Sequence, residues 1–185
     1  MSLKFALLAA LSEGPKTGYD LAHGIDGSIG LFWSASHQQI YRELGSLKDE
    51  SLLRFTEIHQ EEKPDKKIYE LTRSGRAELR RWIAEPTELA PNKSVLLIKV
   101  FVGHLVGPAV LLKEIRRIKQ IKLRELEKFN EIERTHFSDP SSLPLDSKFQ
   151  YLTLRWGIRS SKAWLSWSDE IFKLLNDEHA PGKNL

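Results

Sequence analysis

The stretch ASHQQIYRELGSLKDESLLRF, residues 35–55, decides the fold of this chain. At the period of an α-helix, Ile40, Leu44 and Leu47 form one apolar face. Ser36 is predicted as the N-cap, and Gln39, three residues later, completes a capping box. The face opposite the apolar one carries polar or small residues: Gln38, Arg42, Gly45 and Asp49, flanked by Gln39 and Ser46. The stretch therefore predicts an amphipathic surface helix that leads directly into a strand.

The segments before and after this helix are predicted to form further helices and a β-hairpin. Residues 3–11 are apolar all round, which predicts a buried helix, and TGYDLA begins a short second helix with Thr17 as its cap and Asp20 in its first turn. After the opening stretch, residues 52–58 and 66–72 are predicted as the two strands of a hairpin. A helix over 73–84 follows and ends before Pro86. Three helices followed by a hairpin are the order of a winged helix-turn-helix, which we predict over residues 1–86.

The C-terminal half is predicted to be entirely helical. We expect residues 87–93 to be a linker and residues 94–185 to be a dimerisation domain with helices over 94–106, 108–136 and 145–176. The middle helix carries a long apolar stripe, and its length predicts a partner helix outside its own small domain. The last helix is apolar on two opposed faces, which indicates two packing partners, one of them another subunit. The predicted dimerisation residues are Leu111, Ile115, Ile118, Leu126, Phe129 and Trp156.

The amino-acid composition limits which classes of function are possible, but it does not identify the function. The chain of 185 residues has a net charge of +3, but residues 1–86 carry 12 Lys and Arg against 13 Asp and Glu. Any DNA binding by that half must therefore come from a local arrangement of charge. The absence of cysteine excludes disulfides and suits a cytoplasmic protein. Lys99, His104 and Pro108 interrupt the apolar run 95–112, so we expect a helix buried inside protein and not a membrane span.

Enzyme signatures are missing from the sequence. The six histidines are scattered, and no HExxH, GxSxG or phosphate-binding glycine loop is present. We therefore predict a protein that is not an enzyme and needs no cofactor or metal.

Four motifs in register resemble one family. LKFALLAAL, TGYDLA, IYRELGSLKDESLL and YELTRSGRAEL stand in the order and spacing of the PadR-like transcriptional regulators. The C-terminal half resembles the larger type of that family, which carries a virulence-activator-like helical domain. The resemblance implies a homodimer that binds pseudo-palindromic operator DNA, mostly as a repressor, and in some members releases DNA on binding a small aromatic or hydrophobic effector.

The resemblance also implies which residues contact DNA. It makes the opening stretch the recognition helix, whose DNA-binding residues are Ser36, His37, Gln38, Gln39, Tyr41 and Arg42. Gln38 and Gln39 are candidates to read base edges, since glutamine can pair bidentately with adenine. Arg42 could reach a guanine or a phosphate, and Gly45 and Ser46 keep the helix thin enough for close approach. The expected wing contacts are Lys63, Lys66 and Lys67.

Two alternatives stay open from the sequence. Phe149, Trp156 and Trp167 could line an effector pocket, because small residues interrupt their stripe, but such rings are more often ordinary core. Glu61, Glu62 and Asp65 beside the wing lysines also allow a winged-helix module that binds another protein and never binds DNA.

Overall fold

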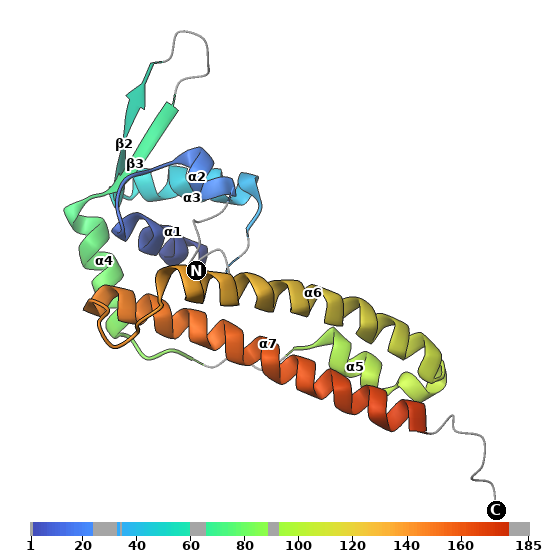
Figure 1. The fold of residues 1–185 in the computed structure, drawn as a ribbon. Helices are drawn as coiled ribbons and strands as arrows, with labels where there is room; N and C mark the ends of the chain where they lie inside the picture. The colour runs from blue at the N-terminus through green and yellow to red at the C-terminus, as the bar shows by residue number, and fades with distance from the viewer. Residues whose placement is uncertain (1, 24–32, 34, 60–65, 89–92, 178–185) are drawn as a thin grey trace, which may run out of the picture. The chain divides into compact units, whose positions relative to one another are not determined.

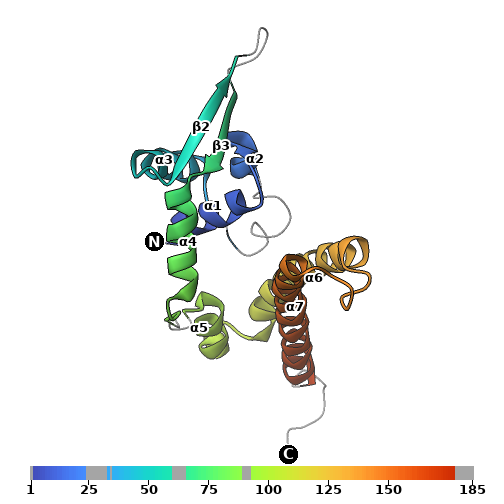
Figure 2. The ribbon, with the colours of Figure 1, turned by 90° about the vertical axis from the view of Figure 1, so that its left-hand side faces the viewer.

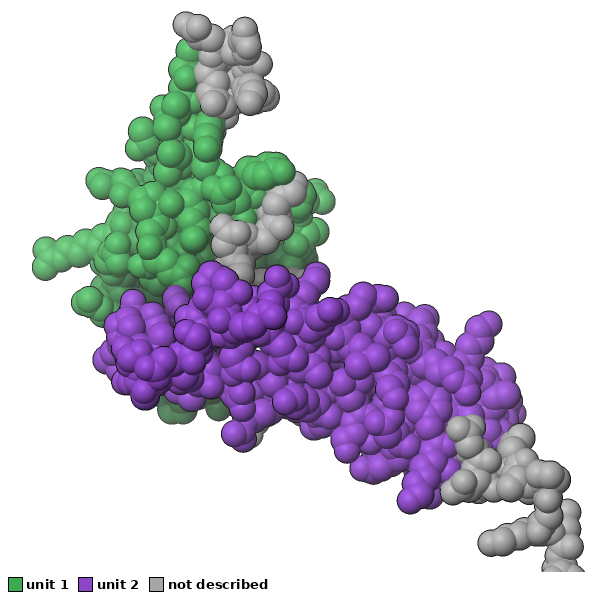
Figure 3. All heavy atoms as spheres, viewed as in Figure 1, with its two compact units in different colours: residues 1–89 green, residues 90–185 purple. Residues whose placement is uncertain are grey.

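The chain forms two compact units, residues 1–89 and residues 90–185, which Figure 3 distinguishes by colour. A computed structural model describes residues 2–23, 33, 35–59, 66–88 and 93–177.

The first unit is a winged helix-turn-helix, as predicted (Figure 1). Its elements in chain order are α1 (Ser2–Ser12), β1 (Lys16–Thr17), α2 (Gly18–His23), α3 (His37–Asp49), β2 (Leu53–Ile58), β3 (Lys66–Leu71) and α4 (Arg73–Ala84). The strands form one antiparallel sheet in the order β1-β3-β2. The sequence did not predict β1, because a strand of two residues is too short to show the alternation that identifies strands.

The core of the first unit forms around α1. Leu7, Leu8 and Leu11 are each at most 1% exposed, which confirms the predicted buried helix. The apolar face of α3 packs into the same core, since Leu44 and Leu47 are completely buried. This packing fixes which face of α3 remains exposed.

The turn after α3 is held in place by α4. Ser51 has a left-handed φ of 59°, its N–H donates to the carbonyl of Lys48, and the Leu52 N–H donates to the carbonyl of Leu47. These two bonds satisfy the last carbonyls of α3 in a Schellman motif. Gly75 of α4 lies against this turn so closely that a Cβ there would sit 1.9 Å from the Leu52 carbonyl oxygen. Only glycine fits this position, so α4 and the end of α3 are fixed relative to each other.

The second unit is helical throughout the residues described. It contains α5 (Val95–Phe101), a 3-10 turn η2 (Gly103–Leu105), α6 (Pro108–His136) and α7 (Leu145–Asp177). Pro108 occupies the first turn of α6, as predicted. Figures 1 and 2 show α6 and α7 side by side and antiparallel. Three polar contacts connect them along their length: Lys119 with Asp169, Glu125 with Ser161, and Glu133 with Arg155.

The apolar stripe of α6 is covered by α7 of the same chain. Ile115 is 0% exposed, Phe129 is 4% exposed and Leu111 is 8% exposed. The Phe129 ring lies against Gly157, where a Cβ would be 3.0 Å from two of its atoms. We therefore correct the expectation that the length of this stripe requires a second chain. Ile118 and Leu126 are half-buried in the same unit, whereas Trp156 is 72% exposed.

The apolar run at residues 95–112 also differs from its prediction. The helix ends at Phe101, and Ile98, Phe101 and Leu105 are 65–84% exposed, so the run is not one buried helix. None of the helices described is both long enough and apolar enough to cross a membrane.

Candidate nucleic-acid interface

The N-terminus of α3 is held by the predicted capping box. The Ser36 hydroxyl oxygen accepts from the Gln39 N–H at 3.3 Å, and the Ser36 N–H donates to Oε1 of Gln39 at 2.9 Å. Bidentate pairing with adenine needs both the oxygen and the nitrogen of a side-chain amide. The cap already uses the amide oxygen of Gln39, which is one of these two groups. Gln38 has no such cap bond and is the stronger candidate reader. His37 is exposed in the first turn beside it.

The outward face of α3 is polar and thin. Gln38, Arg42 and Ser46 are exposed, and Ser46 donates to Glu50 one turn later at 3.2 Å. A Cβ at Gly45 would meet no atom within 4 Å. The packing of the chain therefore does not require glycine at this position, although glycine in mid-helix is unfavourable. A surface that approaches α3 closely supplies a reason for it.

Tyr41 connects α3 to the beginning of α2. Its side chain lies over Gly18, where a Cβ would be 2.8 Å from Cε1 of Tyr41 and 3.3 Å from a ring atom of Tyr69. Tyr69 is only 8% exposed, and this burial raises the pKa of its hydroxyl. Tyr41, predicted as a DNA-binding residue, thus also spaces the two helices of the helix-turn-helix, while 48% of it remains exposed.

The start of α2 is closed by a second reciprocal cap. The Thr17 N–H donates to Asp20, and the Asp20 N–H donates to the Thr17 hydroxyl, both at 3.0 Å. The bonds from Thr17, with smaller contributions from the charges of Lys66 and Lys16, lower the pKa of Asp20. The predicted cap at Thr17 is confirmed. The effect of Lys66 shows that this wing residue lies near the Asp20 carboxylate.

Most of the described wing cations are paired within the hairpin. Lys67 lies 3.7 Å from Glu57 on the opposing strand and 4.8 Å from the ring centre of Phe55. Arg54, which the sequence did not single out, pairs with Glu70 at 2.6 Å. Lys63 lies outside the described residues. Because the carboxylates of Glu57 and Glu70 offset the positive charge of these two side chains, α3 is the stronger candidate for DNA contact.

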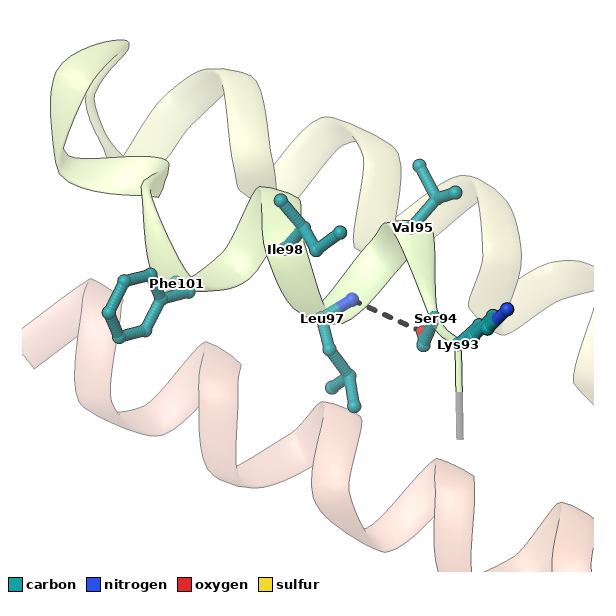
Figure 4. Close-up of a pocket in the computed structure, with 6 residues that line it drawn as sticks. All are labelled: Lys93, Ser94, Val95, Leu97, Ile98 and Phe101. Carbon is teal, nitrogen blue, oxygen red and sulfur yellow. Dashed lines mark hydrogen bonds between the residues drawn. The ribbon is translucent and has the colours of Figure 1, made fainter. Parts of the chain in front are cut away.

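The three rings predicted as an effector pocket do not converge. Phe149 and Trp156 are 64% and 72% exposed, whereas Trp167 packs against the buried cluster of the second unit. Trp156 and Trp167 are eleven residues apart on one helix, which corresponds to about 16 Å. A separate hollow of about 600 Å³ lies along α5 and is lined by Lys93, Ser94, Val95, Leu97, Ile98 and Phe101 (Figure 4).

No group of three or more His, Asp or Glu side chains that could hold a metal ion occurs within the described ranges.

Comparison with known proteins finds similar proteins for both units. The model of the PadR-like family of transcriptional regulators matches residues 7–81, and that of the virulence activator alpha C-terminal domain matches residues 92–176. The Mycobacterium tuberculosis protein named "Probable transcriptional regulator Rv1176c" is 37% identical, with 96% of this chain and 100% of the relative covered. The negative transcriptional regulator PadR of Bacillus subtilis is 31% identical, with 95% and 98% covered.

Solved structures extend the similarity to three dimensions. The crystal structure of Bacillus subtilis PadR in complex with operator DNA superposes with a TM-score of 0.80 at 28% identity, covering 95% of this chain and 99% of that one. The complex of the same regulator with p-coumaric acid has a TM-score of 0.75 at 25% identity and the same coverage.

Proposed function

We infer that this chain, which belongs to the PadR-like family of transcriptional regulators, binds operator DNA as a homodimer and represses transcription. A relative named as a negative regulator, and its crystal structure with operator DNA, support this inference. We also propose that the chain acts by binding and not by catalysis, and that it acts in the cytoplasm.

The main support for DNA binding is the exposed face of α3. It combines Gln38, whose amide can donate and accept at a base edge, with Arg42, whose guanidinium suits a guanine or a phosphate. Gly45, which no internal contact requires, leaves room for the wall of a major groove. Ser36 and Gln39 hold the N-terminus of the helix by their mutual cap, and His37 and Tyr41 flank the face as phosphate contacts.

The wing contributes less to this interface. We propose that Lys66 and Lys67, together with Lys63, contact the DNA backbone next to the major groove that α3 enters. Lys67 must leave Glu57 to do so, because the two are paired within the hairpin.

A homodimer presents two recognition helices to two half-sites. We therefore propose an operator with inverted half-sites whose centres are about 34–36 Å apart, one turn of the duplex. Trp156 and its exposed apolar neighbours on α7 supply a surface for the second subunit.

A small aromatic effector is proposed to release the DNA. The support is the relative whose structure contains p-coumaric acid. The candidate contacts remain Phe149, Trp156 and Trp167. Because these rings do not converge within one chain, a second subunit must complete any pocket around the exposed Phe149 and Trp156. An effector changes DNA binding only if it prefers one spacing of the two recognition helices over another.

Equilibrium binding of the purified chain to its selected DNA site tests the proposal. Log affinity should fall linearly with log salt concentration, because phosphate contacts release counterions. Gln38→Ala should cost roughly 1–3 kcal/mol for the selected site, with relaxed preference at one position in each half-site. Arg42→Ala should reduce the salt slope by about 1 if the guanidinium holds a phosphate.

Arg80→Ala, on the exposed side of α4, is the matched control and should leave both quantities unchanged. An affinity that is insensitive to salt and to both α3 substitutions would favour a winged-helix module that binds another protein.

A further inference from the structure

Three arginines form a row on the exposed side of α4. Arg73, Arg76 and Arg80 are separated by three and four residues, which places them on one side of the helix. All three are exposed. Trp82 lies on the opposite side of α4 and stacks on the ring of Phe5, with the ring centres 4.3 Å apart. The arginine row therefore points away from the core of the first unit.

The charge of the arginine row is not neutralised by neighbouring carboxylates. The fourth arginine of α4, Arg81, contacts Glu78 at 2.9 Å and also pairs with Glu85. The three arginines of the row form no ion pair with any residue in the described part of the chain. Because residues 1–86 carry 12 Lys and Arg against 13 Asp and Glu, the row is a local excess of positive charge. Unpaired arginines at this density favour the binding of anionic groups.

Packing does not explain the arginines. They lie in or next to TRSGRAEL, residues 72–79, in which other residues have structural roles. Thr72 caps α4, Gly75 fits against the turn after α3, and Leu79 is only 8% exposed. The arginine side chains of this segment make no such contact within the described residues.

The surface around the row has the shape and spacing that suit a second helix. Ile83 follows Arg80 by three residues and is 67% exposed, so it continues the row at helical spacing. The resulting intervals of three, four and three residues are those by which one helix packs along another. Ala77 is exposed beside the row and adds only a methyl group, which allows close approach. Guanidinium groups in such a row bind carboxylates bidentately.

The arginine row is separate from the face of α3 that we assign to DNA. Lys4 contacts Glu50, at the C-terminal end of α3, at 2.7 Å and Glu78 of α4 at 3.7 Å. Gln38 precedes Glu50 by twelve residues, which corresponds to about 18 Å along the helix. Figures 1 and 2 show that α4 leaves the hairpin at the end of β3 and continues away from it. A partner bound to the row thus leaves the DNA-binding end of α3 free.

We propose that the arginine row, extended by Ile83, binds an acidic helical segment of another protein. The Asp or Glu side chains of that segment recur at intervals of three and four residues and accept bidentate hydrogen bonds from the guanidinium groups. An apolar side chain one turn farther along the segment covers Ile83. Because a single exposed ion pair contributes little, the number and spacing of the carboxylates determine recognition. This interaction is additional to the operator binding proposed above and does not depend on it.

Fluorescence anisotropy with labelled synthetic peptides tests the proposal on the full chain. Two alanine-based helical peptides of about 20 residues carry Glu at i, i+3 and i+7 with Leu at i+10, or the same residues in reverse order, so that either docking direction is sampled. At low salt at least one peptide should bind saturably, and its counterpart with Gln in place of Glu should not. The Kd should rise about tenfold or more in the triple variant Arg73→Gln, Arg76→Gln and Arg80→Gln. Glutamine is a helix former comparable to arginine and these positions are exposed, so the variant keeps its fold.

A matched triple variant controls for total charge. Arg124→Gln, Arg134→Gln and Arg159→Gln together remove the same charge from exposed positions of the second unit. This control should leave the Kd for the peptide within about twofold of the unsubstituted value. Equal weakening in both triple variants would show attraction to bulk charge and overturn the proposal, and so would the absence of saturable binding of either peptide.

Operator affinity of the same preparations separates this inference from the proposed function. The α4 triple variant should bind operator DNA as the unsubstituted chain does, because the row lies away from the DNA-binding end of α3. A loss of operator affinity of about tenfold in that variant would assign the arginines to DNA phosphates and overturn the acidic helical partner. Failure of the unsubstituted chain to bind any operator overturns the proposed function and leaves the peptide result, and this inference, intact.

Discussion

Gly45→Ala should stabilise the protein and weaken DNA binding at the same time. Gly45 lies in the middle of α3, has no positive φ, and a Cβ there would meet no atom within 4 Å. Because alanine loses less backbone entropy than glycine on entering a helix, the substitution should raise the free energy of unfolding by about 0.5–1 kcal/mol. For a chain of this length, the midpoint of thermal unfolding should rise by roughly 2–4 °C per kcal/mol.

The added methyl group would occupy the face of α3 that we assign to the major groove. If the groove wall approaches Gly45 closely, the methyl group displaces the helix and disturbs the contacts of Gln38 and Arg42. Operator affinity should then fall about tenfold or more, equivalent to ~1.4 kcal/mol. Thermal unfolding and fluorescence anisotropy with a labelled operator measure the two effects on the same preparation.

The reverse exchange on α4 provides the control. Ala77 is exposed in the interior of that helix, so Ala77→Gly should lower stability by about the same amount without changing operator affinity. A Gly45→Ala protein that is more stable and binds operator as tightly as the unsubstituted chain would refute close approach of DNA to the middle of α3.

Two further predictions concern the first unit. Gly75→Ala should destabilise the first unit by about 3 kcal/mol in urea unfolding. The reason is that a Cβ 1.9 Å from the Leu52 carbonyl oxygen forces α4 away from the turn after α3. A loss of stability below about 1 kcal/mol would show that this turn adjusts freely. Acid should weaken the contact between α1 and α3, where the hydrogen bond from Lys4 at 2.7 Å lowers the pKa of Glu50. A lowered folded pKa contributes stability above the unfolded pKa, and that stability is lost as the pH falls through the folded value. The urea midpoint should therefore drop more between about pH 6 and about pH 3 in the unsubstituted chain than in Lys4→Met, and equal drops would contradict this assignment.

The elements with strong periodicity could be predicted from the sequence almost residue by residue. The helices over 73–84 and 108–136 have the predicted bounds. Pro108 marks where the second begins, as predicted, whereas Thr72, which the sequence pattern placed in the preceding strand, caps the first. The capping box at Ser36 was predictable for the same reason, since it depends only on residues three apart. Local chemistry of this kind does not depend on the rest of the fold.

Pairings between distant segments could not be predicted in the same way. The stripe on α6 indicates an apolar partner, but the pattern is identical whether that partner is α7 of the same chain or a helix of a second one. The apolar run at 95–112 likewise indicates burial, yet Phe101 is 84% exposed, since none of the residues described in the second unit covers it. Periodicity reports which face is apolar and does not report what covers it.

The candidate interface was predictable in outline but not in its internal contacts. The sequence places Gln38, Gln39 and Arg42 on one face of α3, and they are exposed together. It does not reveal that the amide oxygen of Gln39 accepts a hydrogen bond from the Ser36 N–H, or that Lys67 lies opposite Glu57 in the register of the hairpin. Both contacts depend on side-chain geometry that residue types alone leave open.

Selection of DNA sites from a random duplex library by the purified chain tests the central claim most directly. The enriched sites should contain two inverted half-sites separated by about one helical turn, and Gln38→Ala should shift the preference at one symmetric position in both halves. Failure to enrich any site, or enrichment of a single unpaired half-site that Gln38→Ala and Arg42→Ala leave unchanged, would contradict a dimer that reads its operator through α3.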